Sequence, residues 1–586
     1  MNSKVLFVLA TIVFFCFPVA CGPVQTENDN GNAKDEEIKE RALTPVESQR
    51  PIPRVTDNMP TFISGYKLKD FKTLAKAQDM LLFDSSLTGE YFPLIKYSGN
   101  YFSLPSYVGD KLAWGEALAS IGSVVGASLV GIDKSNQGGY DYVRLLKPYF
   151  NQTEKLVLNN VGAGSGSTFW YEIFPSVAFF KLVDLYPKFS DIEEIMKKVA
   201  DRWVEGIAML SRGMAYPNFD HTALNFSTST AYDNGIWKEP DAAAGVAWME
   251  YMAYRRFGDK RYLSAAKLCM DFLSSLSVNK GPYYEILMPY GSLLAARMNA
   301  ESGTRYDIDK FISFSMDGNN SYRHGWGVII QEVGGISMSG LVGQQHEQYA
   351  FAMNTFDQMS TMLPIARYAP EYGTALGLWA LNCISASRLF YEDEHPADRQ
   401  TAYGRFIASE TNPICYEGVR GTLEGGNFEQ YKATLASVGP YGVGDRQKCN
   451  DTRAGLDFCP YGSAWVGELA AIYNPTDVEQ ILQLDCRATD FFGDDTYPTF
   501  LYYNPYNTDK EVSVTFSDEM QKADIYDMYK KKIILVDCFN GTKITIPSKS
   551  SCLIVTVPPN SKTEFVDSKV LVNGKIIDHN YIYNEN

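Results

Sequence analysis

Apolar positions between residues 60 and 480 repeat mostly with the period of an α-helix. In residues 190–211, "SDIEEIMKKVADRWVEGIAMLS", apolar side chains recur at i, i+3, i+4 and i+7 along one side. Ser190 and Glu193 predict a capping box at the start of this helix. Residues 241–258 and 260–276 predict a further pair of helices joined by a short loop.

Two changes in this pattern predict the architecture. Residues 371–391 are apolar almost all round, which is typical of a helix buried on both sides, as in an inner ring covered by an outer ring. From about residue 495, short runs rich in Val, Ile, Tyr and Thr alternate with Asn, Gly, Pro and Lys turns. These runs predict an antiparallel β-sandwich. We therefore expect a mainly α protein, with a helical barrel over 59–482 and a β-sandwich over 483–586.

The N-terminal segment carries a targeting pattern. Residues 1–20 combine a positive start with a short apolar run and predict a signal peptide. "VAC" at 19–21 resembles a bacterial lipobox, although Pro18 replaces the usual leucine-like residue. Lipid on Cys21 would attach the protein to the outer membrane or the periplasmic face of a Gram-negative cell, with plain secretion as the alternative. Residues 21–58 are polar and acidic, which predicts a disordered tether.

Charge and cysteine content narrow the partners. A net charge of −16 over 586 residues argues against nucleic-acid binding, and an anionic substrate would need a local Arg or Lys cluster. The sequence contains no CxxC pair, so it does not predict a structural zinc site, and we expect no metal or cofactor. The nearest candidate disulfides are Cys449–Cys459 and Cys538–Cys552, whereas buried free thiols are an equal alternative for the two helical cysteines, Cys269 and Cys383. The sequence leaves the oligomeric state open, a homo-oligomer included.

Aromatic residues make up 13% of the chain, and sugar rings stack on such faces while polar side chains bind their hydroxyls. Polar and aromatic residues gather in five loops, where binding residues are commonly placed: 217–245, 315–335, 340–351, 412–422 and 439–448. Glycosidic cleavage needs two carboxyl groups, and Glu239 and Asp241 flank Pro240 just before a predicted helix. Asp241 is alternatively a helix cap, which leaves Glu239 as the better acid/base candidate.

His324 and His346 are the candidate histidines of these loops. His346 adjoins Glu347 in a segment predicted to turn helical, so only one of the two side chains would face a shared site. "HEQYA" lacks the second histidine of the HExxH zinc pattern. A general base, a hydrogen-bond donor, a metal ligand and a structural polar contact all remain open.

Three arginines are candidate carboxylate anchors: Arg323, Arg367 and Arg420. Arg367 is alternatively the partner of a helix C-terminus, and Arg420 the partner of nearby Glu417. Each arginine therefore has a structural alternative or lies beside a candidate histidine.

Several stretches, among them "YRHGWG", "ICYEGVRG" and "YPTFLYYNPY", together resemble exported (α/α)-barrel carbohydrate-active enzymes over residues 80–560. Glycoside hydrolase family 154 is the group they most resemble. The resemblance implies an (α/α)6 barrel, a β-rich C-terminal domain and hydrolytic release of terminal β-glucuronic acid from a glycan.

That reaction would use Glu239 or Glu417 as the general acid, with Asp241, Glu347 or a histidine activating water. Trp237 or Trp326 would stack on the sugar. The fold leaves two alternatives open: a uronate lyase with His324, His346 and Tyr349, and a surface glycan-binding lipoprotein without catalysis. The remaining candidate substrate contacts in these loops are Tyr416 and Asp445.

Overall fold

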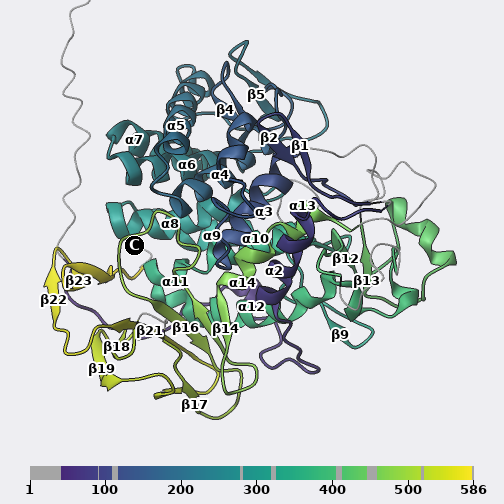
Figure 1. Ribbon diagram of the computed structural model, residues 1–586. Coiled ribbons are helices and arrows are strands. Elements are labelled where there is room, and N and C mark those ends of the chain that lie inside the picture. The colour runs from purple at the N-terminus through teal and green to yellow at the C-terminus, as the bar shows by residue number, and fades with distance from the viewer. Residues whose placement is uncertain are drawn as a thin grey trace, which may run out of the picture. The chain divides into compact units, whose positions relative to one another are not determined.

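A computed structural model describes residues 41–583 except residues 90, 109–115, 278–280, 319–324, 404–411, 445–457 and 517–519. These described residues belong to one compact unit (Figure 1). The predicted signal peptide and lipobox lie outside them. Among the described residues, no helix is both long and apolar enough to cross a membrane.

Six helices form a closed inner ring in which each helix packs on the next and the last returns to the first. They are α3 (Ala117–Leu129), α4 (Phe169–Leu185), α6 (Ala242–Phe257), α8 (Met288–Ser302), α10 (Ala352–Met362) and α14 (Val466–Ala471). These helices are buried on nearly every side, as α10 is at every position. The ring confirms the predicted (α/α)6 class directly from helix contacts.

Helices with one buried face cover this ring on the outside. Among the described residues they are α2 (Phe71–Leu82), α5 (Ser190–Ser211), α7 (Lys260–Ser275), α9 (Ile308–Met316) and, more deeply buried, α12 (Gly373–Ala386). Beside α3, the short 3-10 helix η1 (Arg144–Tyr149) and the hairpin of β1 (Lys96–Ser98) and β2 (Tyr101–Ser103) occupy the outer position. Still shorter helices are α1 (Pro53–Thr56), α11 (Ile365–Tyr368) and α13 (Pro460–Ser463).

The predicted helices have the expected bounds, with two differences. Helix α5 covers the predicted 190–211, but Phe189 is its N-cap and no side chain caps it. The capping box is therefore wrong, because Glu193 pairs with Arg256 instead. The predicted apolar helix over 371–391 is α12 flanked by two 3-10 turns, Pro370–Tyr372 and Ser387–Phe390. It is buried on both sides, as expected, because it lies between α10 and the C-terminal strands.

Ring closure depends on a close backbone approach between α3 and α14. A Cβ built on Gly467 would lie 2.1 Å from the carbonyl oxygen of Gly126, and one on Gly126 would lie 2.6 Å from that of Ala464. Neither position has room for a side chain, so glycine is required at both for the ring to close.

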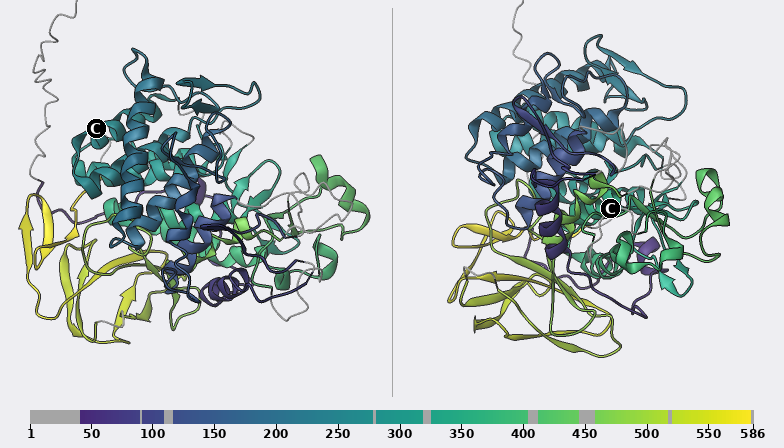
Figure 2. Two further views of the ribbon diagram at one scale, coloured as in Figure 1. Left: turned by 45° about the horizontal axis from the view of Figure 1, so that its top comes forward. Right: turned by 45° about the vertical axis from the view of Figure 1, so that its right-hand side comes forward.

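The C-terminal region is antiparallel β-structure, as predicted. Its main sheet has the order β14 (Tyr473–Pro475), β15 (Leu482–Asp485), β16 (Thr499–Tyr503), β21 (Ser551–Val557), β18 (Ala523–Asp527), β19 (Lys532–Cys538). Two smaller sheets join β17 (Lys510–Ser513) to β20 (Lys543–Ile546), and β22 (Thr563–Val566) to β23 (Lys569–Val572) and β24 (Lys575–Asp578). Figure 2 shows these strands, in light green and yellow, grouped beside the helices.

Alternation along the strands gives the main sheet two buried faces. Phe500 and Tyr502 pack with β17 and β20 in a small separate core. Leu501 and Tyr503 point the other way and join the core of the helical ring. The helices therefore cover the face that a second full sheet would cover in a sandwich. The predicted boundary at 482/483 falls at the start of β15.

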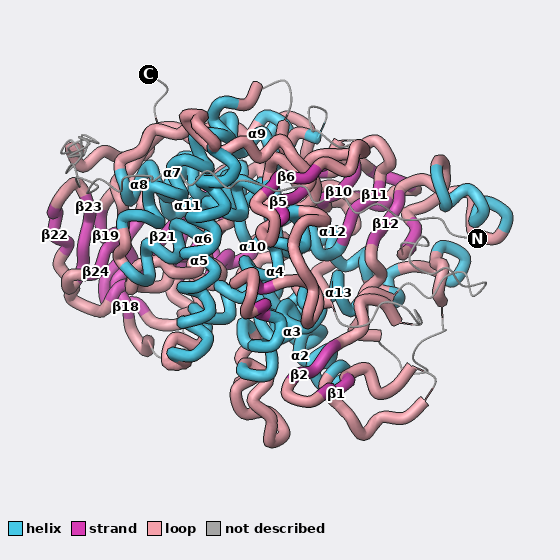
Figure 3. Tube along the Cα trace, turned by 90° about the horizontal axis from the view of Figure 1, so that it is seen from above, coloured by secondary structure: helices cyan, strands magenta, loops and turns pink. Residues whose placement is uncertain are grey.

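The sequence pattern did not predict a sheet whose strands come from both before and after α10 in the chain. Its order is β13 (Tyr441–Val443), β12 (Gly418–Arg420), β11 (Tyr349–Phe351), β10 (Val342–Gln344), β7 (Trp326–Val328). Figure 3 shows β10, β11 and β12 side by side, away from the C-terminal strands. Three hairpins complete the strands: β3 (Phe150–Asn151) with β4 (Leu156–Val157), β5 (Ala223–Asn225) with β6 (Thr230–Tyr232), and β8 (Glu332–Val333) with β9 (Ile336–Ser337).

The tether prediction is wrong for residues 41–58. Arg41 donates hydrogen bonds to backbone carbonyls of His579 and Asn580, and Ile52 and Val55 are buried. The segment is ordered despite its polar sequence, because its polar groups make backbone and ionic contacts with the rest of the protein. One of these is an ion pair between Arg50 and Asp309.

The predicted Cys538–Cys552 disulfide is also wrong, because both residues are free and lie on β19 and β21. Strand β18 separates those strands, so they lie about 9–10 Å apart, too far for a disulfide. Cys459 is a free buried thiol, and Cys449 lies outside the described residues. The buried free thiols expected at Cys269 and Cys383 are confirmed.

Candidate active site

The segments that lead into successive inner helices are fastened to one another. The Glu239 carboxylate binds the start of α4, and the Asp241 carboxylate accepts backbone N–H groups of Tyr284 and Leu287 at the start of α8. The side chain of Asn354 in α10 donates to the Glu285 carbonyl oxygen. We call this end of the ring the mouth. Helix N-termini carry partial positive charge, which favours the carboxylates gathered there.

Glu239, the sequence-predicted acid, is a tertiary cap of α4. It is 1% exposed, and its carboxylate accepts the Thr168 hydroxyl, the Trp237 indole N–H at 2.9 Å and the Trp170 backbone N–H at 2.8 Å. Burial raises the pKa of Glu239 to about 7 despite these donors. Because these donors surround the carboxylate, its local role is to fasten α6 to α4.

Asp241 and Glu285 lie beside Glu239. The charge of Glu285 contributes to raising the pKa of both other carboxyls, and the charge of Glu239 contributes to raising that of Asp241. Asp241 is 1% exposed, and burial holds its pKa well above the usual range. It does not cap α6 with its side chain. Its bonds to the backbone on both sides of Glu285 instead fix the segment that carries Glu285. Glu285 itself is only partly buried. It is therefore the most accessible carboxyl of this group.

Glu417 forms a second carboxyl group at the mouth. Its two oxygens accept the hydroxyls of Tyr107 at 2.6 Å and Tyr349 at 3.3 Å. Tyr461 joins the two groups: its ring lies 6.2 Å from that of Tyr107, and the charge of Glu285 contributes to raising its hydroxyl pKa. The mouth therefore holds both carboxyl groups in the neighbourhood of Tyr461.

Aromatic side chains border the first carboxyl group. Trp237 is partly exposed and stacks on Tyr284, with ring centroids 6.1 Å apart and planes 18° apart. Trp326, the other predicted sugar platform, is 2% exposed and stacked on Phe351 within the sheet. Tyr416 is likewise buried against Phe458. The prediction that Trp326 and Tyr416 contact substrate is wrong, since neighbouring rings cover both.

Two of the three predicted carboxylate anchors have structural roles. Arg367 is buried against Asp490, which joins the ring to the segment before β16. Arg420 is 1% exposed, stacks over Phe428 and donates to Glu347 and two backbone carbonyls. Neither guanidinium is available to a substrate. The alternative pair of Arg420 with Glu417 is also wrong, because residues three apart on a strand point to opposite faces.

His346 and Glu347 lie in the turn between β10 and β11 and are exposed. The predicted helical turn is therefore wrong there. The His346 ring packs beside Gly325, the residue after predicted His324. Arg323, His324 and Asp445 lie outside the described residues, and their roles stay predictions.

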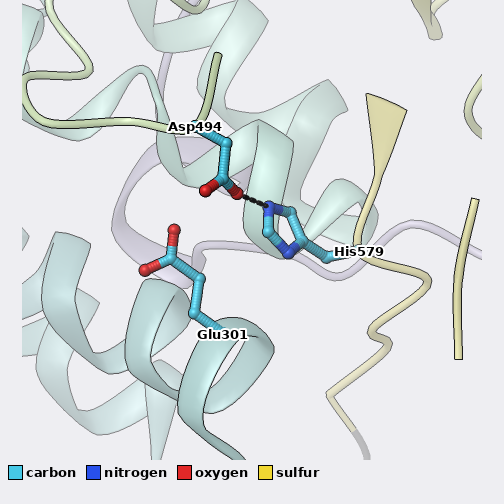
Figure 4. Close-up of side chains that lie close together, drawn as sticks. All are labelled: Glu301, Asp494 and His579. Carbon is cyan, nitrogen blue, oxygen red and sulfur yellow. Dashed lines mark ion pairs between the residues drawn. The ribbon is translucent and has the colours of Figure 1, made fainter. Parts of the chain in front are cut away.

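One group of side chains has the composition of a metal site. Ligand atoms of Glu301, Asp494 and His579 all lie within 4.8 Å of one another (Figure 4). Two arginines already bind these carboxylates, Arg297 at Glu301 and Arg255 at both acids. Burial also lowers the pKa of His579 to about 4, so the ring is neutral. A divalent cation would have to displace two guanidinium groups, and the arrangement fits a buried ion-pair network.

Glu250 is a buried carboxyl inside α6 that the mouth does not use. It is 0% exposed, and neither oxygen has a hydrogen-bond partner among the described residues. Burial holds its pKa well above its unfolded value of about 4.3. A raised acid pKa means that the folded state binds the proton more tightly. Its contribution to stability is therefore full below about pH 4.3 and is lost as the pH rises.

Replacing Glu250 by Leu is expected to raise the free energy of unfolding by about 1–3 kcal/mol at pH 8 and much less at pH 4. Thermal unfolding followed by circular dichroism at both pH values measures this difference. Glu194→Gln is the control, because that side chain is 65% exposed and its replacement should be near neutral at both. An equal shift of the midpoint by Glu250→Leu at both pH values contradicts the prediction.

The sequence reading missed Glu285, Tyr461 and Tyr107. A usable signal was present for Glu285, which lies in "GPYYEILMPYG" with Pro289 at the first turn of α8. Like Asp241, it is an acid placed just before an inner helix. Tyr461 and Tyr107 carry no comparable local signal, because ring closure alone brings them to the mouth.

No family model matches the sequence, and no curated protein matches it. Three solved structures illustrate what the fold is similar to. A GH127 β-L-arabinofuranosidase from Geobacillus stearothermophilus T6 aligns over 88% of this chain and 86% of its own, at 10% identity and a TM-score of 0.32. A metagenome-derived family 9 endoglucanase aligns over 68% and 80%, at 10% identity and 0.39. A D-mannose isomerase aligns over 68% and 98%, at 11% identity and 0.37. Likenesses at these scores carry no conclusion about activity, so the ring of six helices rests on the contacts described above.

Proposed function

We propose that this chain is a glycoside hydrolase that works at the mouth with two carboxyl groups. The observation that supports this most is that a partly exposed Glu285 and Glu417 both lie in the neighbourhood of Tyr461. The charge of Glu285 acts on the Tyr461 hydroxyl, and Glu417 accepts the hydroxyl of Tyr107, whose ring lies 6.2 Å from that of Tyr461. Hydrolysis of a glycoside needs one carboxyl to protonate the leaving oxygen and a second to activate water or attack carbon.

Each carboxyl has surroundings suited to one of these roles. Glu285 adjoins Asp241 and Glu239, and its charge contributes to raising the pKa of both. Like charges gathered in one site favour a shared proton, as a proton donor requires. Glu417 accepts two tyrosine hydroxyls, which stabilise its charged form, as a base or nucleophile requires. Trp237, stacked on Tyr284, offers a flat face for a sugar ring.

The proposed substrate is a glycan with a terminal β-linked uronic acid. Its carboxylate needs a cation, because the mouth is otherwise acidic. Arg367 and Arg420 are engaged elsewhere, so the proposal assigns this role to Arg323. That residue lies two positions before Gly325, which contacts His346.

Two aryl glycosides separate the reaction from its specificity. p-Nitrophenyl β-D-glucuronide and p-nitrophenyl β-D-glucoside share linkage and leaving group and differ in the carboxylate at C6. We expect cleavage of the glucuronide with at least about a hundredfold preference in kcat/KM, because the glucoside would leave the proposed cation unpaired. Equal cleavage of both would reject the proposed uronate specificity and support the proposed glycoside hydrolysis. Release of an unsaturated product from a uronate polysaccharide, without hydrolysis of either glycoside, would instead establish a lyase.

A further inference from the structure

A second cluster of aromatic and polar groups lies on the outside of the ring, at the position beside α3 that η1 and the β1–β2 hairpin occupy (Figure 1). Tyr97 and Tyr140 stack there with ring centroids 4.8 Å apart and planes 18° apart. They are 38% and 43% exposed, so both rings remain accessible from solvent. We call this pair the tyrosine platform.

The platform is held rigidly from the backbone side. Gln137 and Tyr140 exchange both backbone hydrogen bonds across Gly138 and Gly139, whose φ values are +60° and +85°. Positive φ at both central residues is the type I′ hairpin turn, which strongly favours glycine. The hydroxyl of Tyr97 is bonded to that of Tyr142 at 2.8 Å. Tyr140 therefore projects from a fixed two-residue turn.

A buried ionic anchor supports the same turn from below. Lys134 is 0% exposed, donates to Asp79 at 2.7 Å, and also donates to the Gln137 side chain. Its ammonium lies 3.1 Å from the ring centroid of Phe83 and 4.5 Å from that of Tyr142. Holding a surface turn on a buried ion pair fixes the exposed rings before any ligand arrives, which lowers the entropic cost of binding.

A groove of about 390 Å³ lies against Tyr140 of the platform, a size in the range of small-ligand sites. Its wall includes Tyr140 and Gly139, and its polar rim is formed by Asn100, Asp141, Arg144 and Lys147. Arg144 and Lys147 both bind Asp191, and Arg144 also binds Asp141. Two cations thus pair with two carboxylates, Asp141 of the rim and Asp191 next to it, so these groups together offer hydrogen-bonding atoms with balanced charge.

We propose that this groove is a second saccharide-binding site, which takes a neutral pyranose ring of a polysaccharide chain. The C–H face of the ring stacks on Tyr140, and the rim groups bind its hydroxyls. The balanced rim favours a neutral sugar over an anion. The site would hold a polysaccharide on the enzyme while the mouth acts on another part of it. It stands independently of the reaction proposed for the mouth.

Affinity electrophoresis of the full chain in native gels that contain xylan, arabinogalactan or β-glucan tests this site. We expect at least one polysaccharide to retard the protein. Tyr140→Ala should weaken that retardation about tenfold in apparent Kd, and Asn100→Ala should weaken it less. Phe565→Ala, which removes a ring 46% exposed on β22, is the matched control and should leave retardation unchanged.

Hydrolysis of p-nitrophenyl β-D-glucuronide separates the two proposals. Tyr140→Ala should leave its kcat/KM unchanged, since a monosaccharide substrate occupies the mouth alone. The second site is overturned if no polysaccharide retards the wild-type chain, or if Tyr140→Ala and Asn100→Ala are both retarded like wild type. Loss of retardation in Phe565→Ala to the same degree would also overturn it. If the wild-type chain is retarded by a polysaccharide but does not hydrolyse the glucuronide, the proposed reaction is rejected and the second binding site is retained.

Discussion

Glu285→Gln is expected to lower kcat for glycoside hydrolysis by about 10²–10⁴-fold, with KM little changed. A positioned general acid contributes that much to the rate, and glutamine keeps the size of the side chain without the proton. The loss should depend on the leaving group. An alkyl glycoside needs the proton and should suffer fully, whereas a p-nitrophenyl glycoside departs without it and should suffer least.

Glu417→Gln is expected to lower kcat on both glycosides alike, because attack on carbon or activation of water is needed for either. Glu239→Gln is the matched control from the same mouth. Its carboxylate caps α4, so it should reduce stability and leave the ratio between the two glycosides unaltered. Initial rates of all three variants on the alkyl and the p-nitrophenyl glycoside test these expectations. Wild-type rates for Glu285→Gln on the alkyl glycoside would remove Glu285 from the role of acid.

Lys181→Met is expected to destabilise the fold by about 3–5 kcal/mol, because it leaves two buried carboxylates without their cation. Lys181 of α4 lies 2.9 Å from Asp357 of α10 and 2.8 Å from Glu468 of α14. All three side chains are at most 1% exposed. This network joins three inner helices, so its loss acts on the closure of the ring itself. The midpoint of urea unfolding measures the change.

Two further variants decide whether charge or packing is responsible. The triple change Lys181→Met, Asp357→Asn, Glu468→Gln removes the uncompensated charges and should recover much of the lost stability. Lys197→Met, whose side chain is 47% exposed and pairs with Asp201, should cost at most about 1 kcal/mol. An unfolding midpoint for Lys181→Met equal to that of Lys197→Met would show that the buried network contributes little.

The sequence predicted the positions of some candidate-site residues but not their roles, because a role depends on partners from other segments. Glu239 and Asp241 were located correctly just before α6, because an acid beside a proline at a helix start is a local signal. Their roles were not, since Glu239 is held by Thr168, Trp237 and the Trp170 backbone N–H of α4, and Asp241 is held by backbone N–H groups just before α8. Arg420 was expected to bind substrate, but it donates to Glu347, which only the sheet brings to β12, and to the nearby carbonyls of Thr422 and Glu424.

The sequence by itself determined the helical period of the body, the bounds of α5 and α6, the buried character of α12 and the change to antiparallel strands. Each of these is a property of neighbouring positions along one element, where apolar spacing of 3.6 or 2 residues decides which face is buried. Only the tertiary structure decided that Gly126 and Gly467 close the ring, and that Glu285, Glu417 and Tyr461 meet at one mouth. Those contacts join segments that lie far apart in the sequence, as Gly126 and Gly467 do. Their distances follow from how the whole ring packs, which no local pattern encodes.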